Sequence, residues 1–471
     1  MPVPVITVAQ MREWEKAAWA TGVSEGDVIE KVGRAIAHRL LELTNDGDFI
    51  LVLAGKGHNG DDARAAVPHL KGREVRVVEV TDPNTALPQV DEELSRKPKW
   101  VVDALFGIGL NRPLDEHWTA LINKINSSGM RVLAVDVPSG LNTETGKAEG
   151  AAIHAELTLT VGAPKLGLLN ATDFVGRLEV ANDVGLIPCP IESELQWTLA
   201  SDFIAFPPLR KVASHKGTYG HAALFAGSVG YHGAAVLMTH GAQRAQPGLV
   251  TVYPQDAVYL PVASQLQSAM VHPWIKDPVL PKSITAIGLG PGLASEEFPQ
   301  RHKDFLCTIW QTSMLPVVAD ASALSWLMPG PALGKTVRVM TPHPGEAARL
   351  LGTSSDAVQA DRIGALRELS RKFRDCFVVL KGHQTLVGRG HGPVFINSTG
   401  NAYLAQGGSG DALTGFITGL LAQPQLQHDP ITTIRYAVFE HGAAADRLSQ
   451  QRSNWTVEDL ILELGRKLLS L

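Results

Sequence analysis

Short apolar runs rich in β-branched residues recur along the N-terminal part of the chain, and each ends in a loop with glycine or proline. They cover residues 49–55, 74–80, 100–107, 131–140 and 157–165, and segments of helical character such as 115–129 separate them. Strands that alternate with helices predict a parallel sheet with helices on both faces. Ligands bind such sheets at the carboxyl ends of the strands, so these loops are the first candidates for function.

The pattern changes near residue 190, where prolines become frequent. Residues 186–215 contain Pro188, Pro190, Pro207 and Pro208 and show little periodicity. A second series of apolar runs follows at 221–227, 248–253, 284–292, 315–322, 338–346, 376–382 and 392–397. A chain of 471 residues also exceeds one typical core. We therefore predict two α/β domains, at residues 1–195 and 196–471.

Composition excludes several classes of function. The formal net charge is −5, and no lysine or arginine run offers a surface for nucleic acid. Cys189, Cys307 and Cys376 are far apart and odd in number, which argues against a disulfide framework. The N-terminus lacks the pattern of a secretory signal, and no apolar run is long enough to span a bilayer. We expect a soluble, cytoplasmic protein that binds neither nucleic acid nor membranes.

The most informative segment of the C-terminal half is a glycine loop followed by an acid and an apolar stretch of helical length. It reads Gly407-Gly408-Ser409-Gly410-Asp411. Glycines let successive N–H groups face an anion, and the following helix adds the positive end of its dipole. A carboxylate there is costly unless it acts on a substrate. We interpret Asp411 as the base for a hydroxyl that attacks a phosphoryl group; a flexible turn before a core helix is the alternative.

Other strand ends in this half carry polar groups that extend this interpretation. His343 lies between two prolines in TPHPGE (341–346), and Lys381 and Gly382 follow the run that ends at residue 380. The segment IGLGPGL (287–293) lets a ligand approach the backbone closely. Taken singly, these features are consistent with a rigid turn and a surface lysine in a hairpin.

Taken in order, the motifs HKGTYG, GLGPG, TPHPGE, LKG and TGN…GGSGDALTG resemble the ADP- or ATP-dependent NAD(P)H-hydrate dehydratase family, whose fold is ribokinase-like. The resemblance covers about residues 200–471. It implies phosphorylation of the ring hydroxyl of NAD(P)HX, the hydrate of NAD(P)H, and then loss of phosphate, with Mg²⁺ and with ADP or ATP as co-substrate. By motif position, the hydrate would contact Ala234, Gly292, His343 and Asp411, and the nucleotide would contact Lys381, Gly382, His383, Gln384, Thr385 and Gly410.

This half departs from the family motifs at three places. Ser322 replaces a usual acid, and Ala294 and Tyr403 replace usual glycines. None of them is a residue to which we assign chemistry. We expect Tyr403 to narrow the site.

The N-terminal half has its own glycine loop between a strand and a helix, at residues 52–70. It is neither GxGxxG nor a Walker loop, so a dinucleotide-fold or NTPase assignment is poor. Asp103 and Asp136 end later strands, and parallel strand ends converge. With Asn59 and Ser139 they offer oxygen ligands for a hard cation. The alternative is that both acids only brace loops.

Residues 1–190 resemble the NAD(P)HX epimerase domain, which implies a Rossmann-like parallel-sheet sandwich. Family members carry this domain fused to the dehydratase in this order. The resemblance implies that Asn59, Asp103 and Ser139 hold K⁺. It implies that Asp136 is the acid or base at the nicotinamide ring and that Lys165 assists it. The hydrate would be held by His58, Asn59, Gly60, Asp61 and Asp62 and by Gly107, Ile108, Gly109, Leu110, Asn111, Arg112 and Pro113.

The epimerase loop departs from the usual GNNGGDG. Asp61 adds a negative charge close to the expected phosphate, and Ala63 is expected to restrict the backbone. Lys31 replaces a usual asparagine, and we hypothesise that it offsets Asp61.

Two alternatives to a bifunctional repair enzyme stay open. The C-terminal half is also compatible with a small-molecule kinase of the same fold. The altered loop is also compatible with an N-terminal domain that binds the hydrate but no longer epimerises it. The sequence does not decide between ADP and ATP or between NADHX and NADPHX, and the family leads us to expect a homo-oligomer.

Overall fold

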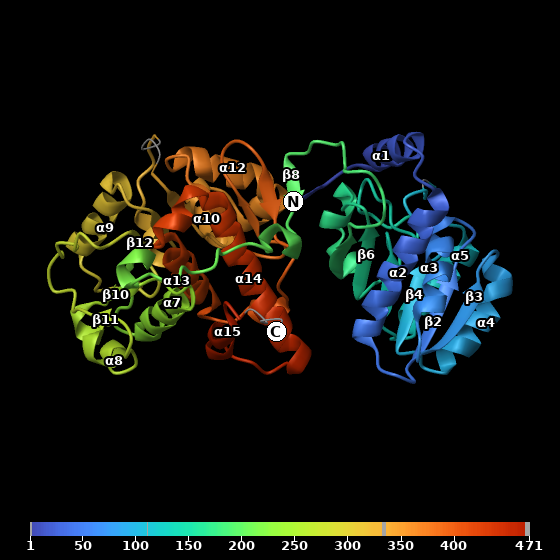
Figure 1. Ribbon diagram of the computed structural model, residues 1–471, viewed down its shortest axis with the longest axis horizontal. Coiled ribbons are helices and arrows are strands. Elements are labelled where there is room, and N and C mark those ends of the chain that lie inside the picture. The colour runs from blue at the N-terminus through green and yellow to red at the C-terminus, as the bar shows by residue number, and fades with distance from the viewer. Residues whose placement is uncertain (1, 111, 332–335, 467–471) are drawn as a thin grey trace. The chain divides into compact units, whose positions relative to one another are not determined.

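The computed structural model describes residues 2–110, 112–331 and 336–466, and the chain divides into two compact units. One unit comprises Val3–Ser193, and the other begins at Glu194. Both contain a largely parallel sheet between helices, so the predicted α/β fold class is confirmed (Figure 1). Among these described residues, no helix is both long and apolar enough to cross a membrane.

The N-terminal unit is built on a six-stranded sheet in which every pairing is parallel. The order is β3-β2-β4-β5-β6-β7. The central strand β2 is buried on both faces, as a parallel strand covered by helices must be. The strands are β2 Phe49–Ala54, β3 Glu74–Glu79, β4 Trp100–Ala104, β5 Val132–Val135, β6 Leu157–Val161 and β7 Arg177–Ala181, and β1 is Val3–Pro4.

Alternate residues of these strands pack on two separate helix layers. Ile50 and Val52 pack with the pair α2 and α3, whereas Leu51 and Leu53 pack with the pair α4 and α5. Figure 1 shows α2 and α3 side by side over the sheet. The helices of this unit are α1 Val8–Ala20, α2 Glu25–Leu43, α3 His58–Ala66, α4 Pro83–Ser95, α5 Glu116–Ser127 and α6 Thr172–Val175.

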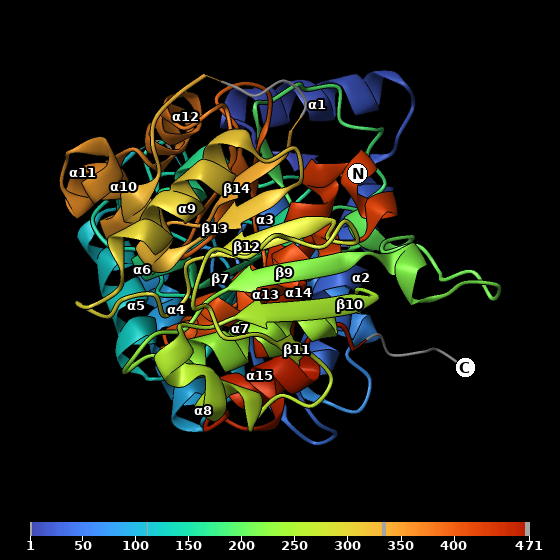
Figure 2. The ribbon, with the colours of Figure 1, turned by 90° about the vertical axis from the view of Figure 1, so that its left-hand side faces the viewer.

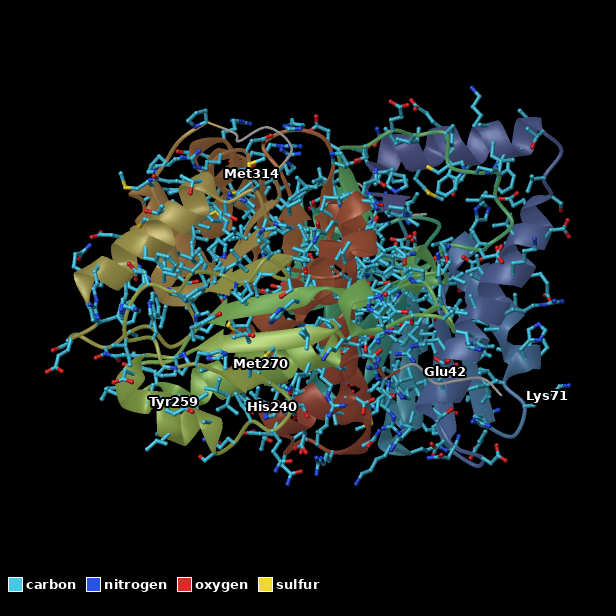
Figure 3. All side chains as sticks on the ribbon, turned by 60° about the vertical axis from the view of Figure 1, so that its left-hand side comes forward. Glu42, Lys71, His240, Tyr259, Met270 and Met314 are labelled. Carbon is cyan, nitrogen blue, oxygen red and sulfur yellow. The ribbon has the colours of Figure 1, made fainter. Side chains whose placement is uncertain are left out.

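The sheet of the C-terminal unit has the order β8-β17-β16-β15-β14-β13-β12-β9-β10-β11. Figure 2 shows β14, β13, β12, β9 and β10 in succession, and Figure 3 labels Met270 in the edge strand β11. The strands are β8 Leu195–Trp197, β9 His221–Phe225, β10 Leu249–Tyr253, β11 Met270–Val271, β12 Ala286–Leu289, β13 Val317–Ala319, β14 Arg338–Met340, β15 Phe377–Leu380, β16 Leu386–Gly388 and β17 Val394–Ile396.

The helices that follow the strands of this unit bury the sheet and carry the site loops at their N-termini. One large apolar cluster joins residues of α7, α13 and α14 to the strands. The helices are α7 His232–Arg244, α8 Tyr259–Ala263, α9 Gln300–Thr312, α10 Pro344–Leu351, α11 Ser355–Ala360, α12 Arg362–Lys372, α13 Ser409–Leu421, α14 Pro430–Gln451 and α15 Val457–Glu463.

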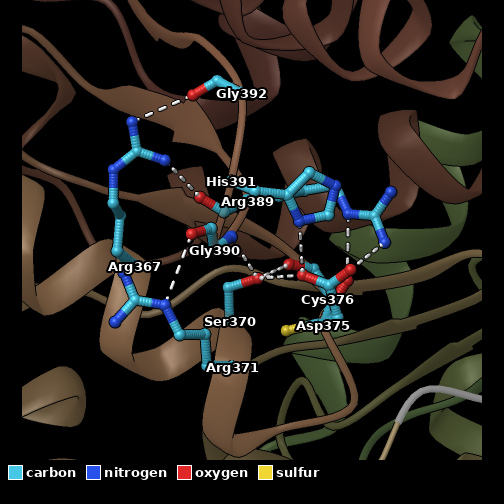
Figure 4. A network of polar contacts seen from close by, with 9 residues as sticks. All are labelled: Arg367, Ser370, Arg371, Asp375, Cys376, Arg389, Gly390, His391 and Gly392. Carbon is cyan, nitrogen blue, oxygen red and sulfur yellow. Dashed lines mark hydrogen bonds and ion pairs between the residues drawn. The ribbon is translucent and has the colours of Figure 1, made fainter. Parts of the chain in front are cut away.

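The strands after β15 run antiparallel, which the alternation of strands and helices did not predict. β15 pairs with β16 and β16 with β17 in antiparallel fashion. At the end of this hairpin opposite its 381–385 turn, Ser370 Oγ of α12 accepts from the Gly390 N–H at 2.7 Å and donates to the Cys376 carbonyl at 2.6 Å (Figure 4). Arg389 pairs with Asp375 at 2.5 Å in the same network. These contacts therefore fix the end of the hairpin that lies opposite the 381–385 turn.

Helices α7 and α13 approach each other so closely that glycine is required where they meet. A Cβ at Gly415 would lie 1.9 Å from the Met238 carbonyl oxygen, and one at Gly241 would lie 2.2 Å from the Ala412 carbonyl oxygen. Backbone cannot yield by such distances without moving a helix. This contact fixes α13, the helix that begins with the glycine loop and Asp411.

Gly415→Ala is therefore expected to destabilise the C-terminal unit by about 3 kcal/mol, because the methyl group forces α7 and α13 apart. Differential scanning calorimetry would show this as a lower Tm for that unit. Gly233→Ala is the matched control, because an added Cβ there meets nothing within 4 Å. Its melting temperature should stay the same or rise; equal melting of the two variants would contradict the packing argument.

Candidate active sites

A cavity of about 620 Å³ opens at the carboxyl ends of β2 and β4. The chain leaves β2 toward β3 on one side and returns to β4 on the other, so this is the topological switch point, where open α/β sheets bind ligands. The predicted residues in its wall are His58, Asn59, Asp62, Gly107, Ile108, Gly109, Leu110, Arg112 and Asp136. Gly60 and Asp61 lie in the first turn of α3, and Pro113 follows Arg112. Asn111 lies outside the described residues.

In the glycine loop beside this cavity, Gly60 occupies the position at which the backbone geometry requires glycine. A Cβ at Gly60 would lie 2.1 Å from the Gly55 carbonyl oxygen. Ala63 lies within α3 and packs in the core, where alanine is a favourable residue. The expectation that Ala63 restricts the loop is therefore wrong, because this position is ordinary helix.

The negative charge of Asp61 is balanced by its own helix. Arg64 Nη1 lies 2.8 Å from Asp61 Oδ1, one turn further along α3. The hypothesis assigned this task to Lys31, whose side chain instead lies against Gly185. A basic residue at i+3 on a helix was the available signal, and the sequence analysis missed it.

Asp136 and Lys165 form a buried ion pair at one end of the cavity. Lys165 is fully buried, and its Nζ lies 2.5 Å from Asp136 Oδ1. The same oxygen accepts from Thr160 Oγ1 and from the Val161 N–H. Asp136 has a φ of 61°, which costs a non-glycine residue about 1 kcal/mol or more. Strain and several partners together fix this carboxylate at the cavity wall.

A second buried carboxylate, Asp103, lies behind the wall with neutral partners. Its Oδ1 accepts from Ser139 Oγ at 2.6 Å, and its Oδ2 accepts from the Ser139 N–H at 2.8 Å. Asn59 contacts the loop that follows β4, because its Nδ2 donates to the Phe106 carbonyl at 2.9 Å. Burial raises the pKa of Asp103 to about 6. The Asp103 carboxylate, the Ser139 hydroxyl and the Asn59 amide offer oxygen atoms, the ligand type that suits a hard cation such as K⁺.

Two further carboxyl groups face the cavity near Asp136. Burial, with Asp136, Asp61 and Glu15 as neighbours, raises the pKa of Asp62 to about 8. Burial also raises the pKa of Glu15 in α1, which lines the cavity. Glu15 was missed, because an acid in an amphipathic helix usually faces solvent.

The second site lies in the C-terminal unit, where the neighbouring parallel strands β12 to β15 end at one edge. Asp411 is in the first turn of α13, and Gly408 before it has a φ of 96°, which glycine adopts without strain. An added Cβ at Gly410 would lie 3.3 Å from Lys381 Nζ. The structure therefore brings the glycine loop, Asp411 and Lys381 together.

Lys381 is the centre of a cluster of carboxylates. Its Nζ lies 2.9 Å from Asp320 Oδ1 and 3.9 Å from Glu346 Oε2. Burial disfavours its charge, but Asp320 and Glu346 more than offset this and raise the pKa of Lys381. Asp320 also accepts from Thr414 of α13 at 2.7 Å. Sequence reasoning missed Asp320, because one acid after a strand is common.

Asp411 has an unusual protonation equilibrium in this setting. Burial first, and then Asp320 and Glu346, raise the pKa of Asp411 to about 7, against the opposing effect of Lys381. A carboxyl group poised near neutral pH suits a general base. Across the described residues, no group of three or more His, Cys, Asp or Glu side chains is arranged to hold a metal ion.

The turn at residues 381–385 presents backbone groups held from behind by Arg362. Its Nη2 donates to the Leu380 carbonyl at 3.2 Å, and it also donates to the His383 carbonyl. Gly382 and Gln384 have φ values of 128° and 50°. Thr385 Oγ1 donates to the Gly382 carbonyl at 3.0 Å and closes the turn.

Ala234 and Gly292 meet at a neighbouring strand end. A Cβ at Gly292 would lie 2.7 Å from the Ala234 Cβ, so the glycine permits this contact. Gly290 in the same loop packs on the Asp320 carbonyl. His343 begins α10, where its Nδ1 accepts from the Gly345 N–H and its own N–H donates to Glu346.

The departures from the family motifs leave this arrangement in place. Ala294 and Tyr403 do not have positive φ, so neither position needs glycine. Tyr403 is 47% exposed and its ring faces Trp455, which gives no support to the expectation that it narrows the site. His441 of α14 donates to the Ser409 carbonyl at 3.0 Å and braces the glycine loop.

Comparisons with known proteins match both halves of the chain. The family model described as NAD(P)H-hydrate dehydratase matches residues 222–466, and the model described as YjeF-related protein N-terminus matches residues 25–97 and 82–167. The bifunctional NAD(P)H-hydrate repair enzyme Nnr of Coxiella burnetii is 34% identical and covers 94% of each chain.

Solved structures are similar to the C-terminal unit. A ribokinase-like superfamily protein of Enterococcus faecalis covers 58% of this chain and 95% of its own, at 24% identity and a TM-score of 0.50. The ADP/ATP-dependent NAD(P)H-hydrate dehydratase of Bacillus subtilis, co-crystallised with ATP and Mg²⁺, covers 55% of this chain and 91% of its own, at 34% identity and a TM-score of 0.48. From the family models and the full-length relative, the chain belongs to the family of bifunctional NAD(P)H-hydrate repair enzymes.

Proposed function

We propose that Asp411 and Asp136 are the catalytic residues of this bifunctional NAD(P)H-hydrate repair enzyme. The observation that carries the proposal is the position of Asp411, half-buried in the first turn of α13 beside Lys381 and with a pKa near neutrality. The N-terminal unit interconverts R- and S-NAD(P)HX, and the C-terminal unit dehydrates S-NAD(P)HX at the expense of an adenine nucleotide.

In the dehydratase site, Asp411 takes the proton of the ring hydroxyl as the hydroxyl oxygen attacks the terminal phosphorus of ADP or ATP. The bridging P–O bond breaks, and AMP or ADP leaves. The N–H groups at the start of α13 and the Lys381 ammonium hold the phosphate charge. The C–O bond then breaks, phosphate leaves, and the neighbouring ring carbon loses a proton, which restores the double bond of NAD(P)H. Ala234, Gly292 and His343 contact the hydrate, and residues 381–385 with Gly410 contact the nucleotide.

In the epimerase site, Asp136 acts as acid and base at the hydroxyl-bearing carbon. The hydroxyl takes up a proton and leaves as water while the ring nitrogen supplies the electron pair, and water then adds to the other face and gives a proton back to Asp136. Lys165 orients its carboxylate from behind, so that one oxygen stays directed at the cavity. The loops that contain His58 to Asp62 and Gly107 to Pro113 hold the phosphates and ribose. Arg64 neutralises Asp61, so the altered loop remains compatible with a bound phosphate.

Cations complete both sites. Asn59, Asp103 and Ser139 would hold K⁺, whose positive charge balances the buried Asp103 carboxylate. Mg²⁺ would enter with the nucleotide, since it keeps several waters and binds proteins through few ligands beyond phosphates. It supplies charge neutralisation on the transferred phosphoryl group.

Two variants, one in each site, separate the epimerase activity from the dehydratase activity. On mixed R- and S-NADHX with Mg²⁺, K⁺ and ADP or ATP, wild-type protein should restore all absorbance at 340 nm. Asp136→Asn should restore the S fraction at the wild-type rate and then slow to spontaneous epimerisation. Asp411→Asn should lose at least about 100-fold in dehydration, because it lacks the base, yet epimerise normally when followed by chromatography.

Each variant is the folding control for the other, since each keeps one activity. A phosphorylated product that accumulates and does not convert to NADH would instead support a kinase. Full recovery by Asp136→Asn would remove that residue from the epimerase mechanism. No epimerisation by the wild type would favour an N-terminal domain that only binds.

The pH dependence follows from the raised pKa of Asp411. Dehydratase kcat/KM should level off above about pH 7 and fall about tenfold per unit below it, as the base becomes protonated. For stability, the pKa of Asp411, raised from about 3.8 to about 7, acts in the opposite direction: the penalty on the folded state accumulates as pH rises from about 4 to about 7 and is complete above 7. Asp411→Asn should melt above wild type at pH 8 and near it at pH 4. A lower melting temperature at pH 8 would contradict this burial argument.

Potassium should stabilise the N-terminal unit. In KCl, the wild-type protein should melt at a higher temperature than in choline chloride of equal ionic strength, because binding to the folded state alone shifts the equilibrium. Asp103→Asn should lose this response, whereas Asp82→Asn, an exposed acid at the cap of α4, should keep it. An equal response in both variants would place the cation elsewhere.

A further inference from the structure

Arg64 joins the glycine loop, helix α3 and strand β3 at one edge of the epimerase cavity. Its Nη2 lies 2.5 Å from Glu79 Oε2 and donates to the Gly55 carbonyl at 2.7 Å, while its Nη1 reaches Asp61 at 2.8 Å. Glu79 is the last residue of β3. Arg64 is partly buried, whereas the Glu79 side chain is 54% exposed. We name Arg64, Asp61 and Glu79 the Arg64 cluster. The mechanism above leaves Glu79 without a task.

The strand order places this cluster where the adenosine end of a dinucleotide hydrate would lie. Asp136, at the reacting ring, follows β5, the phosphate loop follows β2, and Val80 and Thr81 line the cavity directly after Glu79. In the order β3-β2-β4-β5, strand β3 is three positions from β5, about 14 Å at the usual strand spacing. The nicotinamide ring, the phosphates and the adenosine of a bound hydrate would therefore lie at the ends of β5, β2 and β3, in that order.

We propose that Glu79, held by Arg64, makes the epimerase site select the hydrate of NADH over that of NADPH. This inference rests on the proposed function of the N-terminal unit. In dinucleotide folds with a GxGxxG loop, an acid about 20 residues beyond the glycine loop accepts a hydrogen bond from the adenosine 2′-hydroxyl. Glu79 follows Gly57 at this spacing, on the strand that follows the loop helix.

The charges of the Arg64 cluster explain why the site would favour the hydrate of NADH over that of NADPH. Hydrogen bonds from Arg64 lower the pKa of Glu79, so it is an anion at neutral pH. A 2′-phosphate carries about −2 charge and would meet both Glu79 and Asp61. The Arg64 guanidinium that would otherwise bind it is already held by two carboxylates and a carbonyl. A 2′-hydroxyl, in contrast, would donate a hydrogen bond to the Glu79 carboxylate and would not be repelled.

The test uses the full-length protein without nucleotide, so that only epimerisation proceeds. Purified S-NADHX and S-NADPHX are followed to the R form by chromatography. Wild type should favour NADHX in kcat/KM by at least about tenfold, and Glu79→Gln should reduce that ratio about tenfold by freeing Arg64 for the 2′-phosphate. Arg64→Ala should instead increase the ratio, because both acids then face the phosphate unpaired.

Glu74→Gln is the matched control, since Glu74 lies at the other end of β3 and pairs with Arg96. It should leave the ratio unchanged, and the NADHX to NADPHX ratio of the dehydratase should be the same in every variant. Epimerisation with a ratio that Glu79→Gln does not move overturns this inference alone. No epimerisation of either hydrate by wild type overturns the epimerase assignment and this inference with it.

Discussion

The parallel arrangement of strands is the constraint on which both sites depend. It collects the carboxyl ends of the strands at one edge, where loops from distant parts of the sequence meet. The loops can meet only because glycine lets backbone approach backbone: a Cβ at Gly55 would lie 2.2 Å from the Leu105 carbonyl oxygen, and one at Gly290 would lie 1.9 Å from the Asp320 carbonyl oxygen. The glycines thus serve the close approach of loops as much as the binding of phosphate.

Because the strand ends converge, charged side chains become buried there, and in each site one lysine forms an ion pair with a carboxylate. Lys165 is paired with Asp136, and Lys381 with Asp320, at 2.5 and 2.9 Å. In both units a further carboxyl group lies near this pair, Asp62 in the N-terminal unit and Asp411 in the C-terminal unit, and burial raises its pKa. A free energy cost of this kind is offset when substrate, nucleotide or cation brings positive charge or hydrogen bonds.

The sequence predicted the parts that depend on local pattern. Alternation of apolar runs predicted the parallel strands, and glycine followed by acid predicted the start of α13. It missed what depends on packing at a distance: β16, a strand of three residues, and Asp320, whose role appears only through Lys381 and Thr414. The helical conformation at Ala63 also became evident only in the fold, and with it the i+3 spacing that pairs Asp61 with Arg64.

The two acids at the epimerase cavity have different surroundings. Asp136 accepts from an ammonium, a hydroxyl and an N–H, all at its Oδ1. Asp62 is buried beside Asp136, and its pKa of about 8 keeps its proton at neutral pH. The cavity therefore presents a donor and an acceptor at once, which is the arrangement needed to remove a hydroxyl from one face of a ring and return it to the other.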